Sequence, residues 1–347
     1  MSAEREVTVA IPVRDGGRLL EGVLRALAEQ TVAHELLVCD SGSIDGSVAA
    51  ARAHGARVIE IPARQFNHGA TRNLLVGEAR GEHVALLTQD AEPADGRWLE
   101  KLVGGFALAE DVGIAYGAYR PRPEAAPVVR MELERWFRSL APDGSPSVER
   151  MSAGERRAEA DAGAPAAALI GARGFFTDAN ACISREAWLR APFREVAYAE
   201  DRVLAVDMLR AGYAKAYVPA AAVLHSHDYS SIELLRRSFD EWRALREVYG
   251  WREPGGPRHV LRQLRGELGH ARRELAGADV PRGRRYATLA EVSRHNVVRM
   301  AGALLGSRAD VLPPLARRGL SLEHRASFVP LDLDTPLPSS LREDPKR

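Results

Sequence analysis

The chain has 347 residues, of which 46% are hydrophobic and 27% charged, and its formal net charge is +1. This composition is typical of a globular protein with one large α/β core and a smaller unit. The near-neutral balance excludes a whole-protein field that would attract nucleic acid. No run approaches the ~18 apolar residues of a membrane span, and the first residues lack a signal-peptide core. We therefore expect a cytoplasmic protein in which Cys39 and Cys182 are buried, reduced thiols.

Apolar runs of strand length alternate with helical periodicity along the first third of the chain. The runs predict strands at residues 7–13, 36–39, 57–61, 83–87 and 113–119, and the spacing of apolar residues predicts helices at 19–27, 47–54, 69–79 and 98–108. Asn67 is placed to cap the third of these helices with its side-chain oxygen. This βαβα order predicts an α/β fold with a doubly wound, mostly parallel sheet and helices on both faces.

The alternation ends near Pro121. A helix around residues 129–136 precedes a segment at 141–172 that is rich in Ala, Gly and Pro, and we expect this segment to be a mobile loop. Order is expected to resume at Gly174. Beyond it the pattern predicts a helix at 200–209 and strands at 214–218 and 221–224.

From Ser231 onward the chain is predicted to be helical, with amphipathic helices at 261–275 and 286–305. Residues 252–318 contain 14 Arg, no Lys and 6 Asp or Glu, a local charge of +8. Such a surface can attract anionic lipid head groups, each Arg contributing ~1 kcal/mol; the alternative is a solvated helix face. These basic residues are not accompanied by the interleaved aromatic residues typical of nucleic-acid binding, so nucleic acid is the least favoured partner. The last ~25 residues are rich in Pro and charge, so we expect disorder there.

Three of the predicted strands stop at an acidic residue. Asp15 follows the first strand, Asp40 the second and Asp90 the fourth. Open α/β sheets bind ligands beyond the carboxyl ends of their strands. Because these carboxylates share that rim, they indicate one site that holds a metal and a polar, phosphorylated substrate.

These stretches, in their order along the chain, resemble the family 2 glycosyltransferases, which adopt the GT-A fold. The resemblance covers residues 7–229 and rests on three motifs: Ile11-Pro12-Val13, the segment 40–47 (DSGSIDGS) and the pair Glu200-Asp201. Segments 67–73 (NHGATRN), 88–93 (TQDAEP) and 225–227 (HSH) are similar to the subgroup that transfers rhamnose. The resemblance implies a GT-A-like domain at 1–230, with a nucleotide-sugar-binding half at 1–120 and an acceptor and catalytic half at 121–230, then a helical extension at 231–320 and a disordered tail at 321–347.

The resemblance also implies where a nucleotide diphosphate sugar would bind. A carboxylate can accept the N3–H of a pyrimidine, and the family places such groups at strand ends that correspond to Asp15 and Asp40, together with Pro12, Ser41 and Gly42. The alternative for Asp40 is that it caps the following turn, and Asp45 is more typical of a turn than of a ligand. The rhamnosyl-like segments favour a dTDP-linked donor, with UDP next.

A divalent cation is implied by Thr88-Gln89-Asp90, which stands where the family has an Asp-x-Asp motif. Thr88 replaces the first carboxylate, so Asp90 would bind Mg²⁺ or Mn²⁺ with phosphate oxygens and a histidine. His225 is preferred for that ligand, with His227 as the alternative. Arg72 is expected to pair with two oxygens of the pyrophosphate; the alternative is a solvated surface arginine.

Asp201 is expected to be the catalytic base, because transfer to an alcohol requires removal of the hydroxyl proton as its oxygen attacks the anomeric carbon. Glu200 would bind the acceptor or orient Asp201. The alternative for the pair is an acidic helix start, which the helix dipole favours. Asp178 and Asn180 match the family's acceptor-side loop, and the alternative for Asn180 is a turn. A one-step displacement would invert the anomeric centre.

Other functions stay open at this point. Because Thr88 weakens the metal motif, the chain could be a non-catalytic sugar-nucleotide-binding or scaffold protein with a degenerate metal site. A nicotinamide-dependent oxidoreductase is disfavoured, since no Gly-x-Gly-x-x-Gly follows the first strand. The acceptor could be a glycan or a lipid-linked sugar, and in the second case the basic helices would hold the protein at the inner membrane face.

Overall fold

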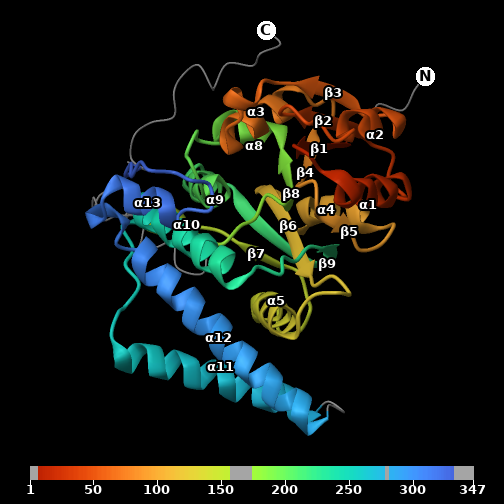
Figure 1. Cartoon of the computed structure of the whole chain (residues 1–347). Helices are drawn as coiled ribbons and strands as arrows, with labels where there is room; N and C mark the ends of the chain where they lie inside the picture. The colour runs from red at the N-terminus through yellow and green to blue at the C-terminus, as the bar shows by residue number, and fades with distance from the viewer. Residues whose placement is uncertain (1–6, 157–173, 278–280, 332–347) are drawn as a thin grey trace, which may run out of the picture. The chain divides into compact units, whose positions relative to one another are not determined.

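The computed structural model describes residues 7–156, 174–277 and 281–331 (Figure 1). Its first four long strands, β1 (Val7–Val13), β2 (Glu35–Asp40), β3 (Arg57–Glu60) and β4 (His83–Leu87), form a parallel array in the order β3-β2-β1-β4. β1 and β2 are buried along nearly their whole length, as expected for strands covered on both faces. The prediction for this half of the sheet is confirmed.

The second half of the sheet is mixed rather than parallel. β8 (Asn180–Ser184) lies antiparallel between β4 and β6 (Val112–Arg120), and β9 (Ala214–Leu224) runs parallel to β6. Two short strands, β5 (Glu92–Pro93) and β7 (Ser147–Glu149), pair antiparallel with β9. The two strands predicted at 214–218 and 221–224 are therefore one strand, interrupted by a bulge.

The bulge in β9 is held by a buried amide. Opposite Gly117 to Tyr119 the register of β9 jumps from Val218 to Val223. Asn180 Nδ2 donates to the carbonyl oxygens of Ala118 (3.1 Å) and Ala221 (2.9 Å), and the Trp98 indole N–H donates to Asn180 Oδ1 (2.9 Å). These bonds satisfy backbone groups that the bulge takes out of the ladder.

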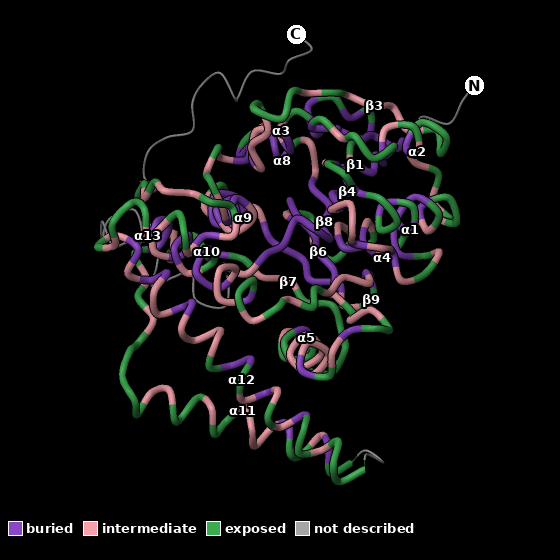
Figure 2. Tube along the Cα trace, in the orientation of Figure 1, coloured by how far each residue is buried: buried purple, intermediate pink, exposed green. Residues whose placement is uncertain are grey.

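Helices cover both faces of the sheet (Figure 1). Apolar side chains of α1 (Gly17–Ala28), α2 (Ser47–Ala53) and α4 (Trp98–Gly104) pack on one face, against residues such as Val9 and Val38. α3 (His68–Glu78), α8 (Arg185–Arg190) and α9 (Glu200–Arg210) contact the strands from the other side. Figure 2 shows that the buried residues concentrate along the strands. Asn67 caps α3 as predicted, accepting from the Ala70 N–H (3.0 Å), and both cysteines are buried.

The described chain also contains short 3₁₀ helices. They are η1 (Ala63–Gln65), η2 (Gly105–Leu108) and η4 (Ala309–Val311). The helix predicted at 98–108 ends as the 3₁₀ turn η2, because Gly105 approaches the sheet closely: a Cβ there would lie 3.0 Å from both Ala115 and Val218 side chains. Of the loop predicted at 141–172, residues 147–149 form β7, and residues 157–172 lie outside the described part.

The described chain divides into two compact units, residues 7–122 with 134–226, and residues 123–133 with 227–331. α5 (Pro127–Leu140) begins in the second unit and ends in the first. The second unit otherwise consists of α10 (Ser231–Tyr249), α11 (Pro257–Gly277), α12 (Arg282–Gly306), η4 and α13 (Pro314–Leu320). Within residues 7–156, 174–277 and 281–331, no helix has the length and apolar character needed to cross a membrane.

α10 is the centre of the second unit. It begins with a capping box between Ser230 and Glu233 and ends at Gly250 in the left-handed region. α12 crosses it at backbone contact, since a Cβ at Gly302 would lie 2.4 Å from the carbonyl oxygen of Leu235. α11 packs its apolar side on α12 through Ala271, Leu275 and Val292.

The segment after α13 is also attached to α10. Asp240 Oδ2 accepts from the Leu322 N–H (2.7 Å), and the Leu331 N–H donates to the carbonyl oxygen of Glu247 (2.8 Å). Arg243 is fully buried between Asp240 (3.2 Å) and the carbonyl oxygen of Arg325 (3.0 Å). The expected disorder therefore does not hold for residues 321–331, and residues 332–347 lie outside the described part.

Asn180→Ala should destabilise the first unit, because it leaves two carbonyl oxygens and the Trp98 N–H buried without partners. We expect the free energy of unfolding in urea to fall by about 2–4 kcal/mol. Gln263→Ala, which removes an exposed amide on α11, is the control and should change it by less than about 0.5 kcal/mol. Equal stability of the two variants would contradict this role of Asn180.

Candidate active site

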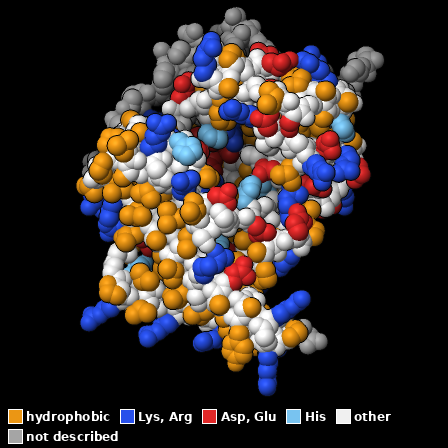
Figure 3. Space-filling view, in the orientation of Figure 1, with side chains coloured by type: hydrophobic (Ala, Val, Ile, Leu, Met, Phe, Trp, Pro, Cys, Tyr) orange, Lys and Arg blue, Asp and Glu red, His pale blue; other side chains and the backbone are white. Residues whose placement is uncertain are grey.

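The strand order brings residues from distant parts of the sequence to one rim of the sheet. β8 runs antiparallel to β4, so that Asn180 at its start pairs with Leu87 at the end of β4. Asp178, just before β8, and Asp90, just after β4, therefore lie on the same side of the sheet. β9 ends at Leu224 opposite Glu92, which places His225 close to Asp90. In the space-filling view, acidic and histidine side chains gather near the ends of these strands (Figure 3).

Glu200 and Asp201 form the first turn of α9. The preceding residue, Ala199, has φ +64° and makes no side-chain cap, so the chain enters the helix through a left-handed conformation that is uncommon for alanine. Two carboxylates at this end are favoured by the helix dipole. Asp201 Oδ1 accepts from the N–H of Arg202 (2.7 Å).

Arg72, in the second turn of α3, lies against Asp178 and Glu200. Its Nη2 donates to Asp178 Oδ1 (2.9 Å), its Nε lies 2.6 Å from Asp178 Oδ2, and its Nη1 lies 3.1 Å from Glu200 Oε1. The Nε contact is close but poorly directed for a hydrogen bond, so charge attraction carries it. His68 Nδ1 is 3.7 Å from the same Glu200 oxygen. Arg72 is thus a buried partner of carboxylates, not a solvated surface arginine.

The protonation of this acidic cluster is set by burial, by repulsion between its neighbouring carboxylates, and by the charges of Arg72 and Arg202. Burial and the neighbouring Glu200 raise the pKa of Asp201 to about 6, against the opposing effects of Arg202 and Arg72. Burial also raises the pKa of Asp178, against the attraction of Arg72. A carboxylate with a pKa near 6 is ionised at neutral pH and basic enough to accept a proton from a reacting hydroxyl.

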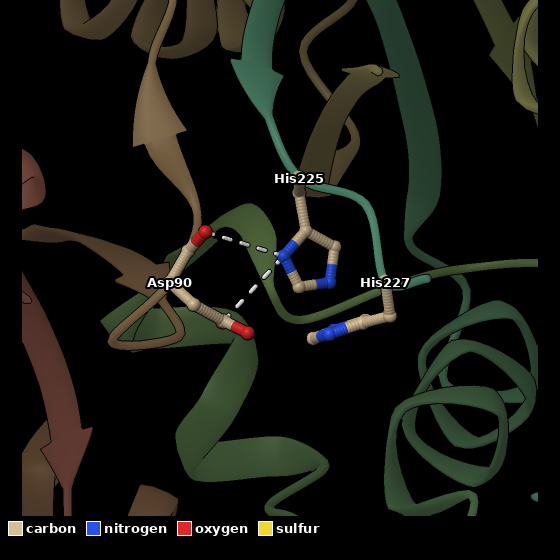
Figure 4. A group of neighbouring side chains, drawn as sticks. All are labelled: Asp90, His225 and His227. Atoms are coloured by element: carbon tan, nitrogen blue, oxygen red, sulfur yellow. Dashed lines mark hydrogen bonds and ion pairs between the residues drawn. The ribbon is translucent and has the colours of Figure 1, made fainter. Parts of the chain in front are cut away.

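Asp90 and His225 form a second cluster at the same rim (Figure 4). His225 Nδ1 lies 3.5 Å from Asp90 Oδ1, and the carbonyl oxygen of Asp90 accepts from Arg122 Nη2 (2.7 Å). One carboxylate and one imidazole are a donor set that suits Mn²⁺ or Mg²⁺ when phosphate oxygens complete the shell. His227 follows on the same segment (Figure 4) as the first residue of the second unit.

Thr88, at the position of the missing carboxylate, has a buried hydroxyl oxygen that finds no hydrogen-bond partner in the described part of the chain. Gln89, the middle residue of Thr88-Gln89-Asp90, makes two hydrogen bonds to the backbone of Arg14. Its Oε1 accepts from the Arg14 N–H (2.8 Å) and its Nε2 donates to the Arg14 carbonyl (3.1 Å). Gln89 therefore ties the loop after β4 to the loop after β1. The sequence carried no signal for this contact.

Tyr119 connects the two clusters. Its ring centroid lies 4.8 Å from that of His225, and its hydroxyl contacts the hydroxyl of Thr177, the residue before Asp178. Burial raises the pKa of Tyr119, and Asp178, Asp201 and Asp90 all add to this effect. The acidic cluster and the Asp90–His225 pair therefore both lie near the Tyr119 side chain. Sequence reasoning placed Tyr119 only in a strand.

The expected nucleotide-binding residues form an ordered loop after β1 and β2. The Asp40 carboxylate accepts from the N–H groups of Gly42 (2.9 Å) and Ser43 (3.0 Å), and Asp15 Oδ1 accepts from the Ile44 N–H (2.8 Å). Asp40 therefore caps the turn that follows β2, which was the alternative to a nucleotide-binding role. Asp45 likewise accepts from the Ser47 N–H (3.0 Å) within its own turn.

Pro12, Ser41 and Gly42 belong to the same two strand ends, whereas Asn180 lies elsewhere in the sheet. The Ser41 N–H donates to the Val13 carbonyl (2.9 Å), Gly42 has φ +92°, and Pro12 pairs with Cys39 in the ladder. Asn180 lies inside the sheet, with its amide bonded to three groups, and does not join the acidic cluster.

Comparisons with known proteins agree on one family. A model described as Glycosyl transferase family 2 matches residues 8–150. The O-antigen chain rhamnosyltransferase RfbN of Salmonella typhimurium is 31% identical over 245 residues, covering 68% of this chain and 71% of that protein. The O-antigen chain rhamnosyltransferase WbaN of Salmonella anatum is 27% identical over 210 residues, covering 59% and 61%.

Among solved structures, the mannosyltransferase PcManGT of Pyrobaculum calidifontis, in complex with GDP-Man and Mn²⁺, has a TM-score of 0.54 and 20% identity, and the match covers 89% of this chain and 87% of that one. It supports the GT-A fold: a mixed, mostly parallel sheet with helices on both faces and a helical C-terminal region. The sheet, the motifs and the rhamnosyltransferase relatives together establish that this chain is a GT-A enzyme that belongs to the family 2 glycosyltransferases.

Proposed function

We propose that this glycosyltransferase is an inverting rhamnosyltransferase, which moves the sugar from a nucleoside diphosphate donor to a hydroxyl group of a glycan or lipid-linked acceptor. The observation that carries this proposal is that Asp201, with a pKa raised to about 6, and the Asp90–His225 pair both lie near Tyr119. The names of the two Salmonella relatives support rhamnose as the sugar. dTDP is the favoured donor nucleotide and UDP the second choice.

The reaction is a single displacement. The acceptor oxygen attacks the anomeric carbon as the bond from that carbon to the diphosphate oxygen breaks, so the anomeric centre inverts. Asp201 takes the acceptor's hydroxyl proton as the new bond forms, and its raised pKa makes it a stronger base than an ordinary carboxylate. The departing nucleoside diphosphate is a good leaving group and needs no acid.

Asp90 and His225 would hold a divalent cation, which when bound neutralises charge on the diphosphate. Thr88, two residues before Asp90 in the sequence, has a buried hydroxyl without a partner in the described part of the chain and would be a further oxygen donor. The loop fixed by Asp15, Asp40 and Gly42 would receive the base and ribose of the donor. Asp178 and Glu200 would define the acceptor side, since both adjoin Asp201. A non-catalytic binding or scaffold role is not favoured, because the two Salmonella relatives are rhamnosyltransferases and the raised pKa of Asp201 suits a base.

The acceptor is proposed to be carried by a membrane lipid, because α11 presents a basic face. Exposed Arg side chains at positions 258, 262, 265, 272 and 273 lie within about one third of the helix circumference at 3.6 residues per turn. Glu267 and Glu274 fall on the opposite side of the helix. Figure 3 shows basic side chains projecting from α11 and α12. A peripheral contact with anionic lipid would hold the enzyme beside such an acceptor.

Asp201→Asn should abolish transfer without loss of donor binding. The amide keeps the shape of the side chain but cannot accept the proton, so we expect kcat to fall by about 10²–10⁴-fold. Release of nucleoside diphosphate from dTDP-rhamnose gives the rate, and calorimetry with dTDP gives the binding constant. Asp143→Asn, at an exposed turn, is the control. Retained turnover in Asp201→Asn would rule out this base.

Asp90→Asn and His225→Ala should each weaken Mn²⁺ binding measured by calorimetry in the presence of dTDP. Because a ligand to the cation is lost, the effect should reach at least the ~10–100-fold that loss of an outer-shell partner costs. His227→Ala distinguishes the two histidines. Unchanged Mn²⁺ affinity in both Asp90→Asn and His225→Ala would remove the metal from this site.

Replacing Arg258, Arg262 and Arg265 together by Gln should weaken binding to vesicles that contain phosphatidylglycerol. At ~1 kcal/mol for each Arg, the partition coefficient should fall by roughly 100-fold. Sedimentation with the vesicles measures it, and the control is a triple replacement of the exposed Arg52, Arg64 and Arg80 by Gln. Equal sedimentation of the two triple variants, or equal binding to neutral vesicles, would contradict a specific basic face.

A further inference from the structure

We propose that Arg72 is a positioning residue for the catalytic base: together with Asp178 it clamps Glu200, and through Glu200 it fixes Asp201. This inference rests on the proposed role of Asp201 as the base. It replaces the expectation that Arg72 binds the diphosphate of the donor. The clamp consists of Arg72, Asp178 and Glu200.

Every nitrogen of the Arg72 guanidinium already has an oxygen partner. Nε and Nη2 face Asp178, at 2.6 and 2.9 Å, and Nη1 faces Glu200 and the carbonyl oxygen of His68, both at 3.1 Å. The exposed fractions of the Arg72, Asp178 and Glu200 side chains are 4%, 7% and 9%. A diphosphate could reach this guanidinium only by displacing a buried carboxylate. The contacts therefore suit a structural cation better than a phosphate ligand.

The clamp joins three elements that are far apart in the sequence. Arg72 comes from α3, Asp178 from the segment before β8, and Glu200 from the first turn of α9; Arg72 and Asp178 are 106 residues apart. α3 is itself fixed by its Asn67 cap, and Asn67 Nδ2 donates to the carbonyl oxygen of Val196 (3.2 Å), on the approach to α9. These contacts of Asn67 fix α3 relative to the segment that leads into α9, and so they fix the Arg72 guanidinium relative to Glu200.

α9 needs such a contact at its start. No side chain caps it, and Ala199 enters it at φ +64°, a conformation that persists only where its surroundings impose it. Because Asp201 directly follows Glu200, the ion pair with Arg72 sets where the carboxylate of Asp201 stands. A misplacement of about 1 Å in a reacting group can cost about 10²-fold in rate.

Arg72 also acts on Asp201 through charge. The charged groups around Asp201 are Glu200, Arg202, Arg72 and Asp178, with His68 beside Glu200 and the phenol of Tyr119 nearby. Arg72 lowers the pKa of Asp201, whereas Glu200 raises it. Removing the guanidinium should raise this pKa, so the rise of kcat with pH should move to higher pH.

The test compares Arg72→Gln, Arg72→Lys and the surface control Arg52→Gln in two measurements: kcat against pH with dTDP-rhamnose, and calorimetric binding of dTDP with Mn²⁺. We expect Arg72→Gln to lower kcat by about 10²-fold, to move the midpoint of the acid limb upward from about 6, and to change the dTDP binding constant by less than about twofold. Arg72→Lys keeps the charge but not the fork, so its acid limb should stay closer to that of the wild type while kcat remains low.

Asp178→Asn covers the case in which Arg72→Gln does not fold, because it keeps the shape of the side chain and leaves Arg72 paired with Glu200. Its kcat should also fall with dTDP binding unchanged, and its acid limb should not move to higher pH. Weaker dTDP binding in the Arg72 variants with an unmoved acid limb would overturn the clamp and restore the phosphate role. Failure of the wild-type enzyme to transfer sugar would instead reject the proposed function, so the two failures are distinguishable.

Discussion

One buried guanidinium enclosed by acidic side chains is the interaction on which this active site depends. A charge removed from water costs several kcal/mol unless it is paired, and three neighbouring carboxylates repel one another unless a cation or a proton intervenes. Arg72 supplies that cation for Asp178 and Glu200. Asp201 is not paired in this way: burial and the neighbouring Glu200 raise its pKa to about 6, against the opposing effects of Arg202 and Arg72.

The mixed half of the sheet explains why these groups meet. An all-parallel sheet would place only residues that follow strands at this rim. The antiparallel β8 adds Asp178, a residue that precedes a strand, and the pairing of β5 with β9 draws His225 towards the loop after β4. The parallel half forms the loop held by Asp15 and Asp40. The sheet thus brings together a loop suited to a nucleotide and a pair of clusters suited to reaction chemistry.

Much of the fold could be predicted because its signals are local. The four parallel strands follow from continuous apolar runs, and the start of α3 from the cap at Asn67. The insertion of β8 between β4 and β6 could not be predicted, since antiparallel pairing between residues about a hundred positions apart leaves no periodic trace. The bulge in β9 was likewise missed, because it depends on an amide supplied by Asn180 in another strand.

The candidate site shows the same division. Asp15, Asp40 and Asp90 could be proposed because strand ends are visible in a sequence, whereas Glu200, Asp201 and His225 were proposed from the resemblance to the family. The carboxylate partners of Arg72 could not be predicted, because a guanidinium pairs with both phosphate and carboxylate oxygens. Asp178 and Glu200 are distant in the sequence and reach Arg72 only in the folded chain. Tyr119 and Gln89 gave no signal, since an aromatic in a strand and an amide in a loop are common everywhere.

The attachment of residues 321–331 to α10 bears on how the protein can be shortened. The buried side chains of Asp240 and Glu247 accept hydrogen bonds from backbone N–H groups of that segment, and the buried Arg243 donates to one of its carbonyls. These contacts make residues 321–331 part of the second unit, packed against α10. A truncation after α13 would remove the backbone partners of Asp240, Arg243 and Glu247. Within the described residues, it would leave Asp240 and Arg243 buried with only their mutual ion pair.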